Sequence, residues 1–230
     1  MVEMAAADGI TQVVATPHCN ARYAFSLERN RTLLAELAAA TAGRLTLSCA
    51  CEFHLSYENL ERVLAEPSTY TISQRNYLLV ELAEYGIGPQ IIQKLHQLRV
   101  RGLVPIVTHP ERSRLLSEGD FRLLRQLIGM RCSVQVTAGS LSGRFGTRAQ
   151  EVAHRLFKAQ MVHLVASDAH DTERRPPRLS EARAAVAQQW GAEVAQAVFV
   201  DNPRAVVEGE PLPYSPEPVL ASRKKRFFFF

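Results

Sequence analysis

The sequence predicts an α/β fold built on one parallel β-sheet. Six apolar segments rich in β-branched residues alternate along the chain with segments of helical periodicity. Connections between such strands are right-handed by default, so either a β/α barrel or a doubly wound sheet is expected. The chain contains neither GxGxxG nor GxxxxGK followed by Ser or Thr. A nucleotide-type phosphate loop is therefore not indicated.

The first half of the chain supplies three of the six expected strands. Gly9 is placed to end an opening helix, and Ser26 is a plausible N-cap for the next one. The strands are short, and each ends close to a polar, ligand-type residue. The expected elements are helix 1–8, strand 11–18, helix 26–41, strand 45–55, helix 57–65 and strand 77–82.

The second half continues the same alternation. Apolar residues at Ile91, Ile92, Leu95 and Leu98 give the segment that begins at Pro89 the spacing of a helix. A glycine-rich loop separates two later elements. The expected elements are helix 89–101, strand 104–108, helix 119–129, strand 132–136, helix 147–159, strand 162–166, helices 180–190 and 192–199, and a last short helix from residue 201.

Length and charge predict one domain with a short tail. A chain of 230 residues with 47% hydrophobic content can bury one sizeable core, and we assign it to residues 1–213. Residues 214–230 are expected to be a disordered tail, basic at 223–226 and rich in Phe at the end. Those four basic residues account for the net charge of +4, so the body is balanced. Nucleic-acid binding is therefore not expected.

Cysteine usage and hydropathy predict a cytoplasmic protein. The four cysteines show no CxxC spacing, and the first ten residues lack the apolar region of a signal peptide. Reduced cytosolic thiols are expected. No apolar run approaches the roughly 20 residues that span a bilayer, so no membrane span is expected. The oligomeric state is not predicted.

Ligand-type side chains follow the expected strands and predict a metal site. In a parallel β/α barrel the carboxyl ends of all strands lie on one face, so these side chains should converge. Imidazoles and carboxylates without a thiolate suit Zn, Mn or Fe, in a cluster of two or three ions that could hydrolyse a phosphate ester. A single His or Glu at a strand end is more often a hydrogen-bonded turn residue, but five such strand ends in one layer favour a shared metal site. The six candidates are His18, Glu52, Glu81, His109, Asp168 and His170.

Two arginines near these residues would suit a phosphate substrate. Arg112 follows His109 by three residues, and Arg175 follows His170 by five. A guanidinium fork matches phosphate oxygens. For neighbouring Arg174 we favour an exposed surface position.

Thiol catalysis is not indicated, although Cys19 stands beside His18. A cysteine phosphatase loop needs an arginine six residues after its cysteine, and position 25 is Phe25. The other three cysteines fail the same test. The remaining histidines are expected to be structural, namely His54, His96, His154 and His163.

Several motifs together resemble the polymerase-and-histidinol-phosphatase (PHP) superfamily. Within it, the chain is similar to the bacterial manganese-dependent protein-tyrosine phosphatases of capsule and exopolysaccharide operons. The resemblance covers about residues 4–207. The motifs are Thr16-Pro17-His18, Glu52, the block Thr108 to Arg112, the block Gln135 to Gly146, Ser167 to His170, and Asp201-Asn202-Pro203.

The resemblance implies a distorted β/α barrel that hydrolyses phosphotyrosine at a centre of two or three ions, Mn²⁺ or else Fe or Zn. Arg112 and Arg175 match the arginines that hold the substrate phosphate. The implied substrate is the tyrosine-rich tail of a bacterial tyrosine autokinase. The positions that match metal ligands are His18, Glu52, Glu81, His109, Asp168 and His170.

One departure from the family pattern adds an expectation about activity. The family has seven strands, and its first carries a His-x-His pair that this sequence does not contain. The resemblance then implies a chain truncated before its first strand, with weak or no activity. Two alternatives remain open: a small-molecule phosphatase acting on a substrate such as histidinol phosphate, and a non-catalytic remnant that docks on the kinase.

Overall fold

The computed structural model describes residues 1–82 and 90–219. All strand pairs are parallel, as predicted. Six strands form one sheet in the order β2-β4-β5-β6-β7-β8, and β1 pairs with β3 in a second sheet. The strands are β1 (Gln12–Ala15), β2 (His18–Cys19), β3 (Thr46–Cys49), β4 (Glu52–His54), β5 (Tyr77–Glu81), β6 (Val104–Thr108), β7 (Ser133–Thr137) and β8 (Leu164–Ala166).

The strand order distinguishes between the two predicted topologies. The large sheet follows the order of the sequence, without the reversal at which a doubly wound sheet changes direction. Sequential parallel strands are the arrangement of a β/α barrel. Among the described residues no ladder joins β8 back to β2, so the six strands form an open arc. This arrangement agrees with the distorted parallel β/α barrel that the family resemblance implies.

The first two predicted strands are each interrupted, which corrects the expectation of two continuous strands. Strand 11–18 divides into β1 and β2, and strand 45–55 divides into β3 and β4. Pro17 has no backbone N–H to donate to a ladder. The amide of Cys51 donates instead to the carbonyl of Tyr70, at 3.4 Å. The chain therefore bends here from the small sheet into the large one.

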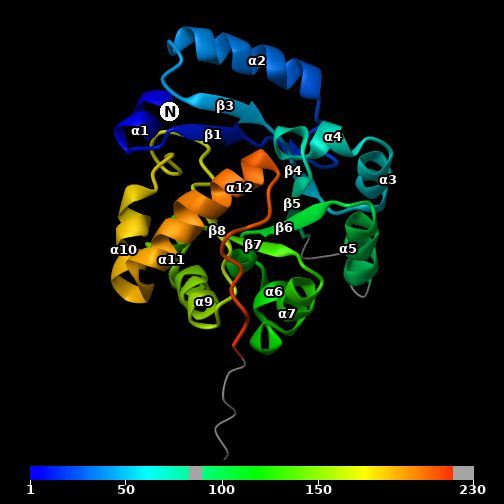
Figure 1. Cartoon of the computed structure of the whole chain (residues 1–230), viewed down its shortest axis with the longest axis vertical. Coiled ribbons are helices and arrows are strands. Elements are labelled where there is room, and N and C mark those ends of the chain that lie inside the picture. Colours follow the sequence, from blue (N-terminus) through cyan, green and yellow to red (C-terminus); the bar gives the residue numbers. More distant parts are fainter. Residues whose placement is uncertain (83–89, 220–230) are drawn as a thin grey trace, which may run out of the picture.

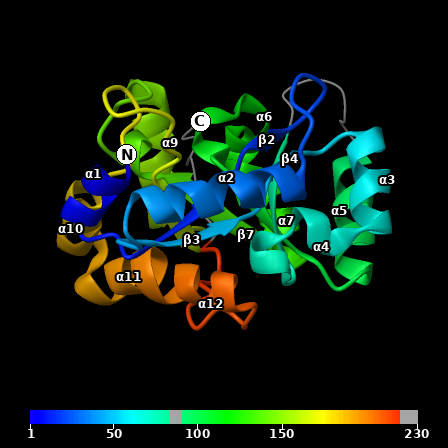
Figure 2. The same ribbon diagram turned by 90° about the horizontal axis from the view of Figure 1, so that it is seen from above.

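Helices cover both sides of the sheets, with α2 over β1 and β3 and with α12 crossing the other side of the small sheet (Figure 1, Figure 2). Ser26 caps α2 as predicted, because its Oγ accepts from the amide of Arg29 at 3.3 Å. The helices are α1 (Val2–Ala7), α2 (Leu27–Ala40), α3 (Tyr57–Ala65), α4 (Pro67–Tyr70), α5 (Ile91–Val100), α6 (Arg114–Ser117), α7 (Arg122–Gly129), α8 (Ala138–Leu141), α9 (Thr147–Lys158), α10 (Ser180–Trp190), α11 (Ala192–Gln196) and α12 (Asn202–Glu208).

Two predicted helices begin or end elsewhere. Helix 119–129 begins at Arg122, because Asp120 and Phe121 have φ angles of 55° and 61°, outside the helical region. Helix 192–199 ends as an α-helix at Gln196 and continues as a π-helical segment, Ala197–Asp201, into α12. The expected start at Pro89 lies outside the described residues.

The core lies between the large sheet and the helices around it. Tyr77 to Val80 are all buried, as are Ile106 and Val107 of the next strand. Strands covered on both faces read as continuous apolar runs, which is the pattern that predicted a parallel sheet. The polar residues that follow each strand are thereby placed at one edge of a rigid scaffold.

Part of the expected tail contacts the body. Asn202 is fully buried, and its Nδ2 donates to the carbonyls of His163 and Tyr214 at 2.8 and 2.7 Å. The amide of Val219 donates to the carbonyl of Ala159 at 3.0 Å. Contacts with the body therefore extend to residue 219, beyond the boundary at 213, and residues 220–230 lie outside the described part. Within the described part, no helix is long and apolar enough to cross a bilayer.

Candidate metal centre

Strand register brings three of the predicted ligands together. His18 and Glu52 are partners across the β2–β4 ladder, and His54 is paired with Glu81 across the β4–β5 ladder. His109 follows β6, the next strand of the sheet. Four candidate ligands thus belong to four adjacent parallel strands: His18 and Glu52 begin the short strands β2 and β4, Glu81 ends β5 and His109 follows β6.

Glu52 lies between two imidazoles. Its Oε2 is 3.1 Å from Nδ1 of His18, and its Oε1 is 2.9 Å from Nε2 of His109. Glu81 faces the same two rings, with oxygens 4.0 Å from His18 Nδ1 and 3.7 Å from His109 Nε2. One donor atom from each of His18, Glu52 and Glu81 lies within 4.8 Å of the others. This spacing allows these three side chains to share a cation, and His109 adjoins them through its contacts with Glu52 and Glu81.

The donor atoms fit a transition metal. Nδ1 of His18 is buried and has no hydrogen-bond partner, although two carboxylates face it. Buried polar atoms are normally satisfied, so an orphaned imidazole nitrogen beside two carboxylates suits a ligand that binds all three. The thiols of Cys19 and Cys51 are buried on the core side, where they contact Asn59 and the Tyr70 carbonyl. The candidate metal ligands are therefore imidazoles and carboxylates, and no thiolate is among them.

Glu52 is held in its charged form. Burial by itself would raise the pKa of this carboxyl, but the hydrogen bond and charge of His109, together with Thr108 and His18, lower the pKa to about 2. The carboxylate is accordingly ionised at neutral pH. An ionised, 7% exposed carboxylate is a suitable anchor for a metal ion.

Asp168 and His170 follow β8, the strand at the other edge of the large sheet from β2. The strand β8 ends at Ala166, and Asp168 has a φ of 50°, so both residues lie in the loop beyond the strand. Arg112 donates from Nη2 to Asp168 Oδ2 at 2.9 Å, and Arg175 pairs with the same oxygen. Nδ1 of His170 lies 3.1 Å from the Asp168 carbonyl oxygen.

The predicted set therefore divides into two groups, and members of both line one cavity. Four candidate ligands form one wall, and Asp168 with its two arginines forms the other. The ring centroid of His170 is 5.9 Å from that of His18, at the side. The cavity has a volume of about 300 Å³ and is lined by His18, Glu52, Glu81, Leu82, His109, Arg112, Ser113, Asp168 and Arg175.

Phe145 is a site residue for which the sequence assigned no role. The guanidinium carbons of Arg112 and Arg175 lie 4.7 and 5.4 Å from its ring centroid. Gly139 makes room for the ring, since a Cβ there would lie 3.0 Å from Phe145 Cε2. The sequence signal was the glycine-rich block 135–146, which does not by itself identify an aromatic support for arginines.

Glu111 was also missed, because its role depends on a contact between distant loops. It is 2% exposed, and its Oε1 accepts from the amide of Thr137 at 3.0 Å and from Ser140 Oγ at 2.7 Å. These bonds fix the turn after β6, in which His109 has a φ of 36°, to the start of α8. Glu111 therefore positions both His109 and Arg112.

Comparison with known proteins gives one consistent family. The chain matches the family described as "Capsular polysaccharide synthesis, CpsB/CapC" over residues 1–208. The tyrosine-protein phosphatase YwqE of Bacillus subtilis is 27% identical over 100% of this chain and 91% of its own length. The tyrosine-protein phosphatase CpsB of Streptococcus pneumoniae is 30% identical over 75% of this chain and 72% of its own.

A solved structure shares the fold. It comes from work on YwqE of Bacillus subtilis and CpsB of Streptococcus pneumoniae, described there as "unique metal-dependent tyrosine phosphatases". The TM-score is 0.83 at 27% identity, over 96% of this chain and 91% of that one. On these grounds the chain belongs to the CpsB/CapC family of capsular polysaccharide synthesis.

Proposed function

We propose that this protein is a metal-dependent protein-tyrosine phosphatase that acts in the control of capsular or exopolysaccharide synthesis. The observation that carries the proposal is one cavity with four imidazole and carboxylate ligands on one wall and two arginines on the other. The names of the family relatives support the same activity. Hydrolysis of a phosphate monoester needs both groups of residues: metal ligands that place cations near the reacting oxygens, and arginines that donate hydrogen bonds to the other phosphate oxygens.

His18, Glu52, Glu81 and His109 are the residues that would hold the metal. Mn²⁺ is the proposed ion, with Fe or Zn as alternatives compatible with these donors. Asp168 and His170 are proposed as further ligands for a centre of two or three ions. When bound, such ions supply Lewis-acid stabilisation of the phosphoryl oxygens and ease deprotonation of the attacking water.

Arg112 and Arg175 are proposed to bind the substrate phosphate. Both guanidinium groups now contact Asp168 Oδ2, so an incoming phosphate would take the place of that carboxylate as their partner. Each guanidinium can present two parallel N–H donors to two phosphate oxygens. Phe145 holds both groups by cation–π contact, which fixes their planes before substrate arrives.

The proposed substrate is the tyrosine-rich tail of a bacterial tyrosine autokinase. The family description links the chain to capsular polysaccharide synthesis, and an open cavity of about 300 Å³ suits a phosphorylated side chain. We also propose a cytoplasmic location, in keeping with four cysteines that are all free.

Kinetics with three substrate types test the proposal. The chain loaded with Mn²⁺ should hydrolyse a phosphotyrosine peptide with a kcat/KM at least tenfold above that for the matching phosphoserine peptide and for histidinol phosphate. Arg112→Gln should lower kcat/KM for the phosphotyrosine peptide by about 100-fold, the loss of roughly 3 kcal/mol from charged hydrogen bonds. Arg204→Gln, an exposed arginine of α12, is the matched control.

Two results would contradict the proposal. A preference for histidinol phosphate would assign the site to a small-molecule phosphatase. Equal losses in Arg112→Gln and Arg204→Gln would show that Arg112 does not bind the phosphate. Metal content, measured by inductively coupled plasma mass spectrometry, should be unchanged in both variants.

A further inference from the structure

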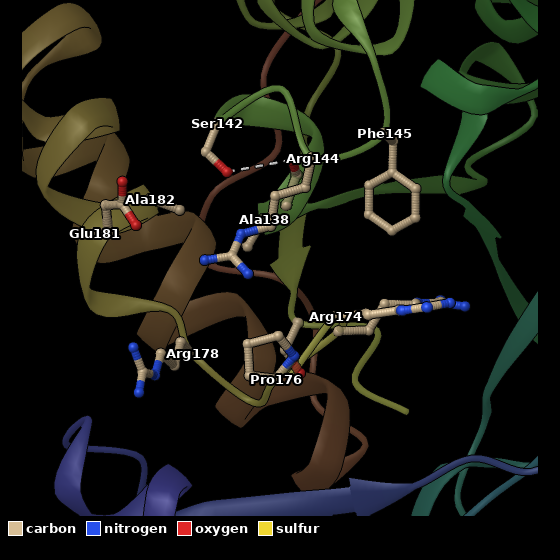
Figure 3. A pocket seen from close by; sticks show the side chains of 12 residues that line it. Ala138, Ser142, Arg144, Phe145, Arg174, Pro176, Arg178, Glu181 and Ala182 are labelled. Atoms are coloured by element: carbon tan, nitrogen blue, oxygen red, sulfur yellow. Dashed lines mark hydrogen bonds between the residues drawn. The ribbon is translucent and has the colours of Figure 1, made fainter. Parts of the chain in front are cut away.

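A second pocket adjoins the phosphate site on its α8 and α10 side (Figure 3). It is formed by the β7–α8 turn, by the loop after β8 and by the first turn of α10. Arg175 and Phe145 line it and also belong to the phosphate site. One peptide could therefore reach both cavities at once.

Arginines dominate the lining of this arginine pocket. Arg144, Arg174 and Arg178 join Arg175, and Glu181 is the acid that lines it. Figure 3 shows Arg144 extending from the α8 side toward Pro176. All three added arginines are exposed. Within residues 1–82 and 90–219, none of the three has a carboxylate oxygen within ion-pair distance.

Two acids near these arginines, Asp171 and Asp8, use their carboxylate oxygens for hydrogen bonds to other groups. Asp171 accepts from the backbone amides of residues 173, 174 and 175, at 2.8, 2.6 and 2.9 Å. Asp8 caps the start of α10 through the amides of Leu179 and Ser180 and the hydroxyl of Ser180. The charges of these two acids act on Arg174 and Arg178, but among the described residues no hydrogen bond or ion pair uses the guanidinium groups of Arg144, Arg174 and Arg178. Their N–H donors are therefore available for an external anion.

The size of the pocket restricts which anion fits. Its volume is about 30 Å³, a tenth of the roughly 300 Å³ of the metal-site cavity. Small residues, among them Gly139 and Ala182, form the floor. A carboxylate fits such a space, whereas a second phosphotyrosine ring requires more. A guanidinium group binds a carboxylate through two parallel hydrogen bonds.

We infer that the arginine pocket binds the carboxylate of an aspartate or glutamate that flanks the phosphotyrosine in the substrate. The inference rests on the proposed phosphatase function and deepens it, because it assigns a sequence preference to the peptide. Side chains two residues apart on an extended peptide face the same side, about 7 Å from each other. An acidic residue within three positions of the phosphotyrosine could thus occupy the pocket. Arg174 would then contact the substrate, although the sequence alone favoured an exposed surface position without a role.

Paired peptides test this inference. Phosphotyrosine heptapeptides with one Asp at each position from −3 to +3 are compared with the matching Asn peptides, by kcat/KM on the Mn²⁺-loaded full chain. We expect at least one position at which Asp is favoured about fivefold, as two exposed guanidinium contacts would give. In Arg144→Gln/Arg174→Gln that preference should disappear, and in Arg204→Gln it should remain.

A binding measurement separates this inference from the proposed function. Fluorescence anisotropy of the same labelled peptides, in EDTA and without turnover, should show the same preference for Asp. If no phosphopeptide is hydrolysed, the proposed function fails, and the anisotropy comparison still decides on the pocket. Equal affinity for Asp and Asn at every position would overturn the inference. So would a preference that survives in the double variant, or a preference for a second phosphotyrosine without one for Asp.

Discussion

Replacing Phe145 with Leu tests whether the aromatic ring prepares the two arginines for phosphate. The ring lies 4.7 Å from the guanidinium carbon of Arg112 and 5.4 Å from that of Arg175, so both contacts are lost together. Each is worth about 0.5–1 kcal/mol at a partly exposed site. The sum, about 1–2 kcal/mol, corresponds to a roughly 5- to 30-fold loss in kcat/KM.

The assay is steady-state hydrolysis of p-nitrophenyl phosphate and of a phosphotyrosine peptide, together with competitive inhibition by inorganic phosphate. The inhibition constant for phosphate should rise with the loss in kcat/KM, because both depend on the arginines. Phe145→Tyr retains an aromatic face and should restore most of the activity. Bound metal should be unchanged, since no described contact joins Phe145 to the four candidate ligands.

A merely structural role for Phe145 would give a different pattern. Thermal unfolding would then change as much as the kinetics, and the affinity for phosphate would stay constant. A kcat/KM within twofold of wild type in Phe145→Leu would refute the reasoning.

Three further changes have expected outcomes. Glu52→Gln should weaken Mn²⁺ binding by at least about 100-fold in isothermal titration calorimetry, because the loss of even an outer-sphere partner lowers metal affinity about 10- to 100-fold. An unchanged Mn²⁺ affinity would show that Glu52 is not a ligand. Glu111→Ala should lower the free energy of unfolding by about 1–3 kcal/mol in urea, since the Thr137 amide loses its acceptor, and Glu111→Gln should lose less. Burial lowers the pKa of His163 to about 4, against about 6.5 when unfolded, so the unfolded state binds the proton first as pH falls. The free energy of unfolding of the wild type, measured by urea denaturation in EDTA, should fall by about 2 kcal/mol between pH 7 and pH 5. In His163→Asn, which keeps an acceptor for the amide of Val134, it should fall correspondingly less.

The fold could be predicted because its signals are local. Continuous apolar runs, such as Tyr77 to Val80 followed by the acidic Glu81, identify strands buried on both faces. The interruptions at Pro17 and Cys51 were not predicted, because they depend on where the backbone finds a partner. The amide of Cys51 donates to the carbonyl of Tyr70, nineteen positions away, and the sequence around Cys51 does not indicate that hydrogen bond.

The site was predictable to the extent that it follows from strand register. His18, Glu52, Glu81 and His109 meet because they belong to adjacent parallel strands in matching register, although His18 and Glu52 begin their short strands instead of ending them. Phe145 and Glu111 were beyond prediction for the opposite reason. Each acts by contact between loops, and loop conformation depends on features such as the left-handed backbone of His109 and the space at Gly139.

Asp168 shows how one carboxylate connects the two walls of the site. Its Oδ2 is shared by Arg112 and Arg175, and its side chain is only 11% exposed, so these charges satisfy one another while substrate is absent. A phosphate that binds the arginines must displace Asp168 from them, which frees a carboxylate beside His170. An isolated buried carboxylate is costly, and a cation is the partner that the proposed centre offers. Phosphate and metal should therefore bind cooperatively. Asp168→Asn weakens the interaction of this side chain with the arginines and with the metal, so it should reduce the cooperativity more than it reduces the affinity for phosphate alone or for metal alone. Titrating phosphate at low and at saturating Mn²⁺ measures the cooperativity directly. A phosphate affinity in the wild type that does not depend on Mn²⁺ would show that Asp168 does not link phosphate binding to metal binding.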